Sequence, residues 1–166
     1  MKTILITGAT SGIGLAAAKK LANSKNNLIL CGRRQHKLDE ISNELSKITN
    51  VLPLRFDVSN KKEVNKVLEK LPDEFNSIDI LINNAGNAHG LDTIQDGSLD
   101  DWDNMIDSNV KGLLYVSRVI IPKMIENQNG HIINIGSLAG REVYEKGNIY
   151  CATKHAVNAI SKAMRI

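Results

Sequence analysis

The stretch Thr7-Gly8-Ala9-Thr10-Ser11-Gly12-Ile13-Gly14 decides the fold. It follows the branched apolar run 4–6, which is too short for a helix and is typical of a buried strand. It precedes residues 15–21, whose strong helix formers and apolar face predict a helix. A strand, a glycine-rich turn and a helix together point free backbone N–H groups and the positive helix end at a phosphate.

The three glycines of this stretch suit three different tasks. Gly8 can make the tight turn, Gly12 lets the backbone approach a pyrophosphate, and Gly14 lets helix and strand pack closely. The spacing G-x-x-x-G-x-G is one residue longer than the common dinucleotide pattern, and glycines in a loop can also be plain turn chemistry. The position between strand and helix favours a nucleotide site. The residues expected to contact the cofactor here are Gly8, Thr10, Ser11, Gly12, Ile13 and Gly14.

Composition narrows the class of protein. A chain of 166 residues with 42% hydrophobic and 23% charged residues predicts one soluble globular domain with a core. The net charge of +3, with both signs interspersed, predicts neither a nucleic-acid nor a membrane partner. We find no signal-peptide pattern and no apolar stretch long enough to span a bilayer. Cys31 and Cys151 lack metal-ligand spacing, so we expect no metal site and the reduced cysteines of a cytoplasmic protein.

Strand-like and helix-like segments alternate along the whole chain, which predicts a doubly wound α/β fold with a parallel (Rossmann) sheet. Ligands of such sheets bind beyond the carboxyl ends of the strands. The last helix keeps its apolar pattern to the final residue, so we expect the single domain, 1–166, to be incomplete at the C-terminus. Further strands are expected at 27–31, 51–58, 78–82 and 131–135, and helices at 35–48, 61–71, from about 99 or 101 to 127, and from about 148 or 149 to 166.

Tyr150 and Lys154 lie four residues apart on the expected last helix and therefore share one face. A tyrosine is a weak acid at neutral pH, and a shift of about three pKa units toward the phenolate takes about 4 kcal/mol. A neighbouring ammonium contributes to such a shift, and Ser137, after the fifth strand, can hydrogen-bond a substrate oxygen. A helical Tyr–Lys pair often has no common task. Together with the dinucleotide turn and the serine, this pair indicates acid–base catalysis.

The end of the second strand indicates which dinucleotide is bound. A carboxylate at this place would bind the ribose 2′-hydroxyl and select NAD. The sequence has Cys31-Gly32-Arg33-Arg34 instead, and guanidinium groups match a phosphate in charge and geometry. We therefore expect NADP (NADPH), with Arg33 as the main phosphate contact. Of Arg33 and Arg34, one is then expected to be merely a solvated residue at the helix start.

These motifs, together with Asn83-Asn84-Ala85-Gly86 and Asn109, resemble the short-chain dehydrogenase/reductase family over the whole chain. The resemblance implies that Tyr150 donates or accepts the proton and that Ser137 orients the carbonyl or alcohol oxygen. Lys154 would hold the nicotinamide ribose and favour the phenolate. Asn109, which alone would be read as a solvated helical amide, would bend the long helix and hold a water that links Lys154 to solvent.

The same resemblance implies further contacts and a larger architecture. Asp57 and Val58 would flank the adenine, and Asn83, Ala85 and Gly86 would lie at the adenosine ribose and neighbouring backbone. The strand order would be 3-2-1-4-5, and family members continue with a sixth and seventh strand, a Pro-Gly segment and a lid. None of these is in this sequence, which leaves the activity of the 166-residue chain open. A homo-oligomer, dimer or tetramer, would form through the long helix 101–127 and the last helix.

Within the family, the runs Gly32-Arg33-Arg34, 131–137 and Gly147-Asn148-x-Tyr150 look like NADP-dependent 3-hydroxy acid (serine-type) dehydrogenases. Acyl-carrier-protein reductases and sugar-alcohol dehydrogenases share much of these runs. His89 and Arg141 are loop cations near the expected mouth, but we leave them outside the site as ordinary surface residues. Two alternatives stay open. One is a non-catalytic NADP-binding module, and the other is an interaction protein built on the apolar helix from Asp101.

Overall fold

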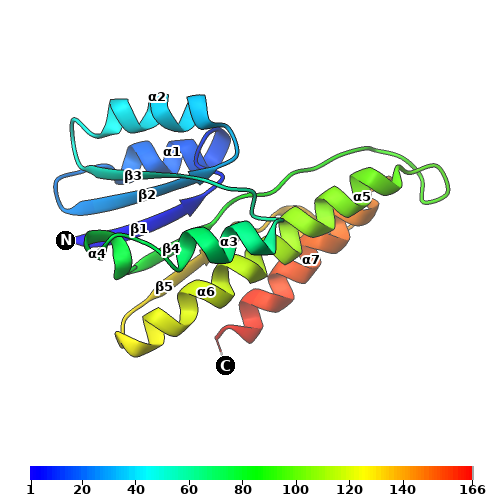
Figure 1. Cartoon of the computed structure of the whole chain (residues 1–166). Coiled ribbons are helices and arrows are strands. Elements are labelled where there is room, and N and C mark those ends of the chain that lie inside the picture. The colour runs from blue at the N-terminus through cyan, green and yellow to red at the C-terminus, as the bar shows by residue number, and fades with distance from the viewer. Residues whose placement is uncertain (166) are drawn as a thin grey trace.

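Short runs of branched apolar residues form a five-stranded parallel sheet in the computed structural model, which describes residues 1–165 (Figure 1). The strand order β3-β2-β1-β4-β5 confirms the expected doubly wound fold. All neighbouring strands are parallel, so their carboxyl ends meet at one edge of the sheet. The strands are β1 (Lys2–Thr7), β2 (Asn26–Gly32), β3 (Asn50–Arg55), β4 (Ile80–Asn83) and β5 (His131–Asn134).

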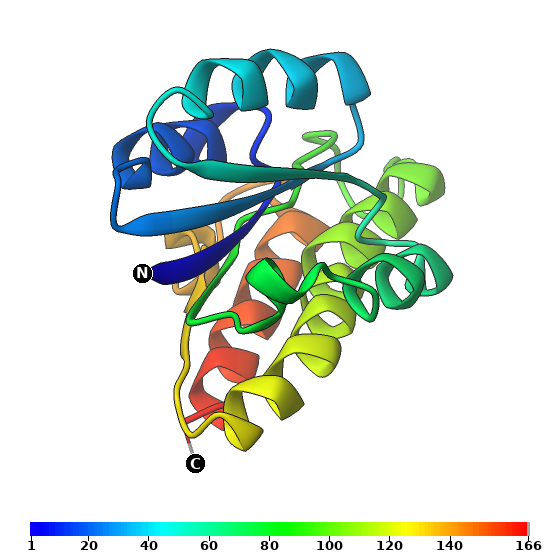
Figure 2. The same ribbon diagram turned by 60° about the vertical axis from the view of Figure 1, so that its left-hand side comes forward.

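Helices cover both faces of the sheet, because successive side chains of a strand point to opposite sides. Ile4 and Ile6 of β1 pack in a core with α1 (Gly12–Leu21) and α2 (Gln35–Leu45). Leu5 faces the other core, with α3 (Lys61–Leu68) and α6 (Leu113–Glu126). Figures 1 and 2 show α7 (Asn148–Ala163) running beside α6 on this second face. Among residues 1–165, no helix has both the length and the apolar composition needed to cross a membrane.

The expected long helix consists of three consecutive segments. It begins with α5 (Leu99–Ile106), which Ser98 caps by accepting a hydrogen bond from the backbone N–H of Asp101. A π-helix follows at Asp107–Gly112, and α6 completes the run. The π-helix widens one turn around Asn109, and π-helical turns occur frequently at functional sites.

Several element ends differ from the sequence-based expectations. The third strand stops at Arg55 rather than at residue 58, because its pairing partner β2 ends at Gly32, opposite Arg55. The second and third helices end at Leu45 and Leu68, and β4 begins only at Ile80. The last helix ends at Ala163, and Ile166 lies outside the described residues. The short helices α4 (Asp73–Asn76) and Leu138–Gly140 were not expected, because three or four residues show no helical period.

Candidate cofactor and catalytic site

A cavity of about 580 Å³ lies at the carboxyl edge of the sheet, where the loops after all five strands meet α7. It brings together most of the residues that the sequence predicts for the site. Those that line it are Gly8, Thr10, Ser11, Gly12, Ile13, Arg33, Arg34, Asp57, Val58, Ala85, Gly86, Tyr150 and Lys154. Of the remaining predicted residues, Gly14, Asn83, Asn109 and Ser137 are not among the lining residues.

The glycine-rich turn divides into packed and open positions. A Cβ on Gly8 would come within 2.9 Å of Ala85 Cα, and a Cβ on Gly14 would overlap Gly8 O and Asn84 Nδ2. Gly12, in contrast, has a φ of +53° and open space where its Cβ would lie. Because Gly12 also begins α1, the turn presents an unobstructed helix N-terminus to the cavity, as a pyrophosphate requires.

Asn84 joins the first and fourth strand ends. The backbone N–H groups of Asn84 and Ala85 both donate to Thr7 Oγ1, each at a distance of 3.0 Å. The Asn84 side-chain Nδ2 donates to Thr7 O at 3.0 Å and to Gly8 O at 3.1 Å. The site prediction omitted Asn84, although its place in Asn83-Asn84-Ala85-Gly86 was a usable signal. The bonds hold the loop after β4 against the glycine-rich turn.

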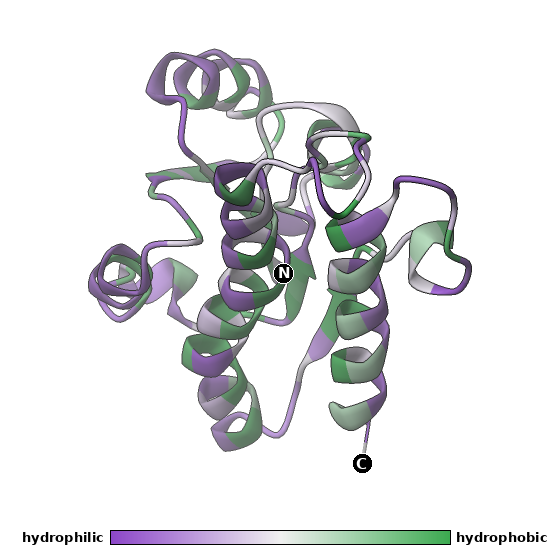
Figure 3. Cartoon of the chain, turned by 90° about the vertical axis from the view of Figure 1, so that its right-hand side faces the viewer, coloured by the Kyte–Doolittle hydropathy of each residue, from purple (hydrophilic) through white to green (hydrophobic). Residues whose placement is uncertain are grey.

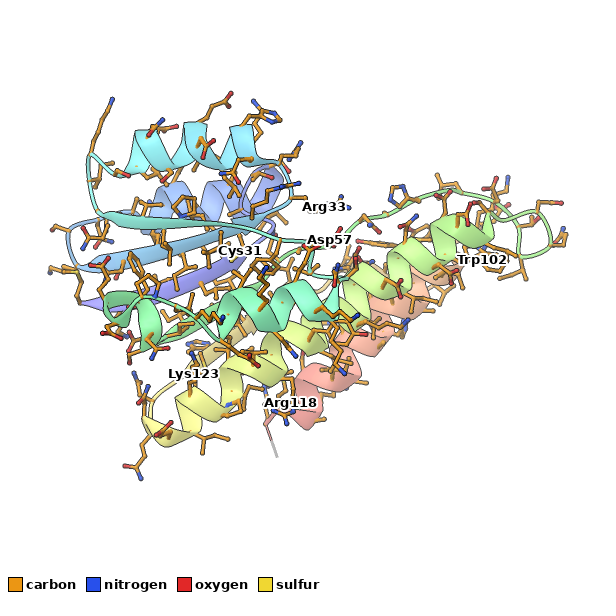
Figure 4. All side chains as sticks on the ribbon, viewed as in Figure 1. Cys31, Arg33, Asp57, Trp102, Arg118 and Lys123 are labelled. Atoms are coloured by element: carbon orange, nitrogen blue, oxygen red, sulfur yellow. The ribbon has the colours of Figure 1, made fainter. Side chains whose placement is uncertain are left out.

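Both arginines after β2 reach the cavity, and they have different partners. Arg34 Nη2 donates to Thr10 Oγ1 at 2.8 Å and to Ser11 Oγ at 3.1 Å. Arg33 Nη1 lies 3.4 Å from Asp57 Oδ2, at the neighbouring ends of β2 and β3 (Figure 4). Arg34 is thus tied to the glycine-rich turn, whereas the Arg33 side chain is 68% exposed and makes one long contact, with Asp57.

Asp57 is a carboxylate in this positive region. Burial alone would raise the pKa of its carboxyl group. Hydrogen bonds from Ser59 N–H and Ser59 Oγ–H, with the charge and hydrogen bond of Arg33, outweigh that effect and hold the pKa of Asp57 below its usual value. Asp57 is therefore a charged acceptor that fixes the loop after β3.

Tyr150 and Lys154 lie on α7, where their spacing of four residues puts them on one face. The Lys154 ammonium lies 5.9 Å from the centroid of the Tyr150 ring, and its Nζ donates to Ile135 O at 2.9 Å. The residue is 8% exposed, and burial lowers the pKa of Lys154. A backbone carbonyl after β5 thus holds the ammonium beside the phenol.

Asn109, in the π-helix, is buried and acts as a clamp rather than as a lining residue. Its Oδ1 accepts from Asn87 N at 2.8 Å, and its Nδ2 donates to Asn87 O at 2.8 Å and to Thr153 Oγ1 at 3.1 Å. Thr153 Oγ1 in turn donates to Tyr150 O at 2.8 Å. Both amide protons of Asn109 are used within the chain, so a water would have to bind another of its atoms. The sequence prediction missed Thr153, although it directly precedes Lys154.

Ser137 and Asn83 serve local structure. Ser137 Oγ accepts from Ala139 N at 3.1 Å and so caps the short helix Leu138–Gly140. Asn83 is buried, and its Nδ2 donates to Ser117 Oγ at 3.0 Å and to Asn134 Oδ1 at 2.9 Å, joining β4 to α6 and β5. His89 lines a separate, smaller hollow, whose lining also includes Tyr150.

Comparison with known proteins identifies the family. Residues 2–166 match the family model described as short chain dehydrogenase, so the chain belongs to the short-chain dehydrogenase family, as the motifs predicted.

The relatives come from bacteria and yeast. The chain is 47% identical over 167 residues to an NADP-dependent 3-hydroxy acid dehydrogenase of Schizosaccharomyces pombe. It is 43% identical over 162 residues to the NADP-dependent 3-hydroxy acid dehydrogenase YdfG of Escherichia coli K12. These alignments cover 99% and 98% of the chain but 64% of each relative, so the chain spans less than two thirds of their length.

Solved structures show the same fold. Serine dehydrogenase from Escherichia coli superposes with a TM-score of 0.94 at 42% identity, covering 98% of this chain and 74% of that one. A closed form of serine dehydrogenase complexed with NADP+ also gives 0.94 at 42% identity, over 98% of this chain and 65% of the other.

Proposed function

We propose that this chain supplies the cofactor-binding and proton-transferring parts of an NADP-dependent dehydrogenase, which interconverts a secondary alcohol and a carbonyl compound. The observation that carries the proposal is a single cavity lined by the glycine-rich turn, by Arg33 and Arg34, and by Tyr150 and Lys154. The relatives named NADP-dependent support this choice of cofactor.

The residues present fit an NADP dinucleotide. Gly12 leaves the N-terminus of α1 open to a pyrophosphate, and Arg33 and Arg34, with Thr10 and Ser11, would hold the 2′-phosphate. Asp57 and Val58 would flank the adenine. When bound, the cofactor supplies or removes a hydride at the reacting carbon.

The proton is handled by Tyr150 Oη. In reduction it gives its proton to the substrate oxygen, and in oxidation it takes one, with Lys154 stabilising the phenolate. Ser137 Oγ already accepts from Ala139 N, which leaves its own O–H proton available to the substrate oxygen. Asn109 and Thr153 keep the first turn of α7 in register with the loop after β4.

The substrate we propose is a small 3-hydroxy acid of the serine type. Its support is the likeness to 3-hydroxy acid and serine dehydrogenases. A 3-oxoacyl-carrier-protein reductase activity is the competing substrate class. A panel of serine, 3-hydroxypropionate, 3-hydroxybutyrate and a 3-oxoacyl thioester separates the two.

We also propose a homo-oligomer formed through α5, α6 and α7. Apolar side chains are exposed along α5 and α6 at Ile106, Leu114 and Ile125. Figure 3 shows apolar bands on the continuous run from α5 to α6 and on α7. Sedimentation of the purified protein tests this proposal. The free thiols of Cys31 and Cys151 support a cytoplasmic location.

The test compares variants of the purified protein. NADPH should bind at least tenfold more tightly than NADH, a difference of about 1.4 kcal/mol, and Arg33→Ala with Arg34→Ala should remove most of it. Tyr150→Phe should reduce turnover by about 10²- to 10⁴-fold while NADPH affinity stays within about twofold. Tyr115→Phe on α6 is the matched control.

Equal affinity for both dinucleotides would contradict the assignment of NADP. Substantial turnover in Tyr150→Phe would mean that another group transfers the proton. Binding of NADPH without turnover of any substrate in the panel would favour the non-catalytic module.

A further inference from the structure

Two polar side chains in the cavity have no task in the reaction proposed above. Asn87 follows the run Asn83-Asn84-Ala85-Gly86, and Ser108 belongs to the π-helix. Both line the cavity that also holds Tyr150 and Lys154. They come from separate elements, and the fold brings them into contact with each other.

Asn87 is held firmly in place by its neighbour Asn109. Its backbone N–H and C=O each make a 2.8 Å hydrogen bond to the Asn109 amide, which leaves the backbone little freedom. Its side-chain Nδ2 donates to Ser108 Oγ at 3.3 Å. Within residues 1–165, its Oδ1 is buried and has no hydrogen-bond partner. Buried acceptors without partners are rare because they are costly.

Ser108 supplies the complementary group. It is 9% exposed, and its Oγ accepts from Asn87 Nδ2, so the hydroxyl proton is not used in that bond. Both residues line the cavity, and the pair combines an unpaired acceptor on Asn87 with an unused donor on Ser108. A hydroxyl group, which both donates and accepts, matches the pair.

A hydroxyl also fits the pair if the amide is turned over. Oδ1 and Nδ2 of an asparagine have the same shape. With Asn87 turned, Oδ1 would accept from Ser108 and Nδ2 would become the unpaired group. A hydroxyl can pair with either end, whereas a carboxylate or an ammonium would suit one orientation alone.

The second buried acceptor without a partner in residues 1–165, Asn83 Oδ1, is a useful contrast. Asn83 is not a lining residue, and its side chain lies between β4, β5 and α6. Within the described part of the chain, Asn87 alone combines such an acceptor with a place in the cavity wall.

We propose that Asn87 and Ser108 form a hydroxyl-binding subsite in the wall of the dinucleotide cavity. The proposal rests on the proposed function, which makes this cavity a cofactor site. The hydroxyl belongs either to a ribose of the bound dinucleotide or to an ordered water. The subsite adds a side-chain contact to a cavity wall formed by the glycine-rich turn, the loops after β2, β3 and β4, and α7.

The experiment uses the variants Asn87→Leu and Ser108→Ala, with Ser117→Ala as the matched control. Ser117 is also a buried serine that accepts from an asparagine Nδ2, but it lies outside the cavity. Calorimetry measures the NADP+ affinity of each variant, and thermal melting checks folding. Crystal structures of the wild type and of Ser108→Ala are determined with and without NADP+. Ser108→Ala removes one oxygen and keeps the test valid if Asn87→Leu fails to fold.

If the ligand is a ribose hydroxyl, we expect both variants to bind NADP+ about tenfold more weakly than Ser117→Ala does. In the complex, a cofactor oxygen then lies within hydrogen-bond distance of the Asn87 amide. If the ligand is an ordered water, we expect both variants to bind NADP+ with affinities within about twofold of the control. A water then bonds both side chains in the wild-type crystals and is missing from Ser108→Ala.

The proposal is overturned if neither a cofactor oxygen nor a water lies within hydrogen-bond distance of the Asn87 amide in either wild-type structure. A wild type that binds neither NADP+ nor NADPH would instead overturn the proposed function. The cofactor-free crystals would still report whether the subsite holds a water.

Discussion

The two ends of the cavity are held in place by different means. At the nucleotide end, the glycine-rich turn and the loop after β4 fit so closely that Gly8 and Gly14 have no room for a Cβ. At the α7 end, hydrogen bonds hold the helix in place. Asn109 Nδ2 donates to Thr153 Oγ1, which donates to the backbone carbonyl of Tyr150. The nucleotide end is therefore held by close packing together with the Asn84 hydrogen bonds, whereas the clamp at the α7 end is a chain of hydrogen bonds.

This difference predicts different responses to mutation. Added volume should damage the nucleotide end, where backbone meets backbone and nothing can move aside. Removal of a polar group at nearly constant volume should damage the α7 end, because its partner is left buried and unpaired.

The largest effect is expected from Gly14→Ala. The new Cβ would overlap Gly8 O within the turn and Asn84 Nδ2 of the loop after β4, so the turn must distort and Asn84 must move away. We expect a loss of at least about 3 kcal/mol in the free energy of unfolding, from overpacking together with the displaced Asn84 hydrogen bonds. Urea denaturation measures the loss.

Gly12→Ala is the matched control, because its Cβ would enter open space and only the positive φ opposes it. That conformation costs about 1–2 kcal/mol for a residue other than glycine. If Gly12→Ala and Gly14→Ala lose the same stability, close packing does not hold the nucleotide end.

A smaller effect is expected from Thr153→Val at the α7 end. Valine keeps the shape of threonine but cannot accept from Asn109 Nδ2 or donate to Tyr150 O. Thr153 is 2% exposed, so the Asn109 proton stays buried and unpaired, at a cost of about 1–3 kcal/mol. Thr153→Ser should recover most of the stability, and a valine variant as stable as the wild type would contradict the clamp.

The same contrast explains which features of the structure could be predicted from the sequence. The nucleotide end is built from residues close in sequence, because its strand, turn and helix follow one another within residues 2–21. Glycine spacing and apolar runs therefore predicted these elements. The clamp joins residues 22 and 44 positions apart, and no spacing rule connects Asn109 with Asn87 or Thr153. The partners of Arg34 and the packing of Asn83 likewise depend on how separate elements meet. The sequence therefore predicted the fold and most of the cavity wall but not its hydrogen bonds.

The smallest effect concerns Asp57, whose carboxylate makes both hydrogen bonds and an ion pair at the nucleotide end. Its carboxylate accepts from Ser59 N and Oγ at 2.9 and 2.8 Å and lies 3.4 Å from the exposed Arg33. Its pKa is lowered in the folded protein, so the charged form contributes stability above the unfolded value of 3.8. That contribution is lost as the pH falls through the lower, folded pKa.

The measurement is the difference in unfolding free energy between wild type and Asp57→Asn as a function of pH. We expect the difference to be constant at neutral pH and to shrink below about 3.8, with Asp39→Asn on α2 as an exposed control. Salt should remove the Arg33 part, because that side chain is exposed, and leave the Ser59 hydrogen bonds. A difference that salt abolishes completely would show that Asp57 acts through charge alone. If salt leaves the difference unchanged, Asp57 stabilises the loop after β3 through the Ser59 hydrogen bonds alone. Arg33 then contributes nothing to stability through Asp57 and remains available to bind the cofactor.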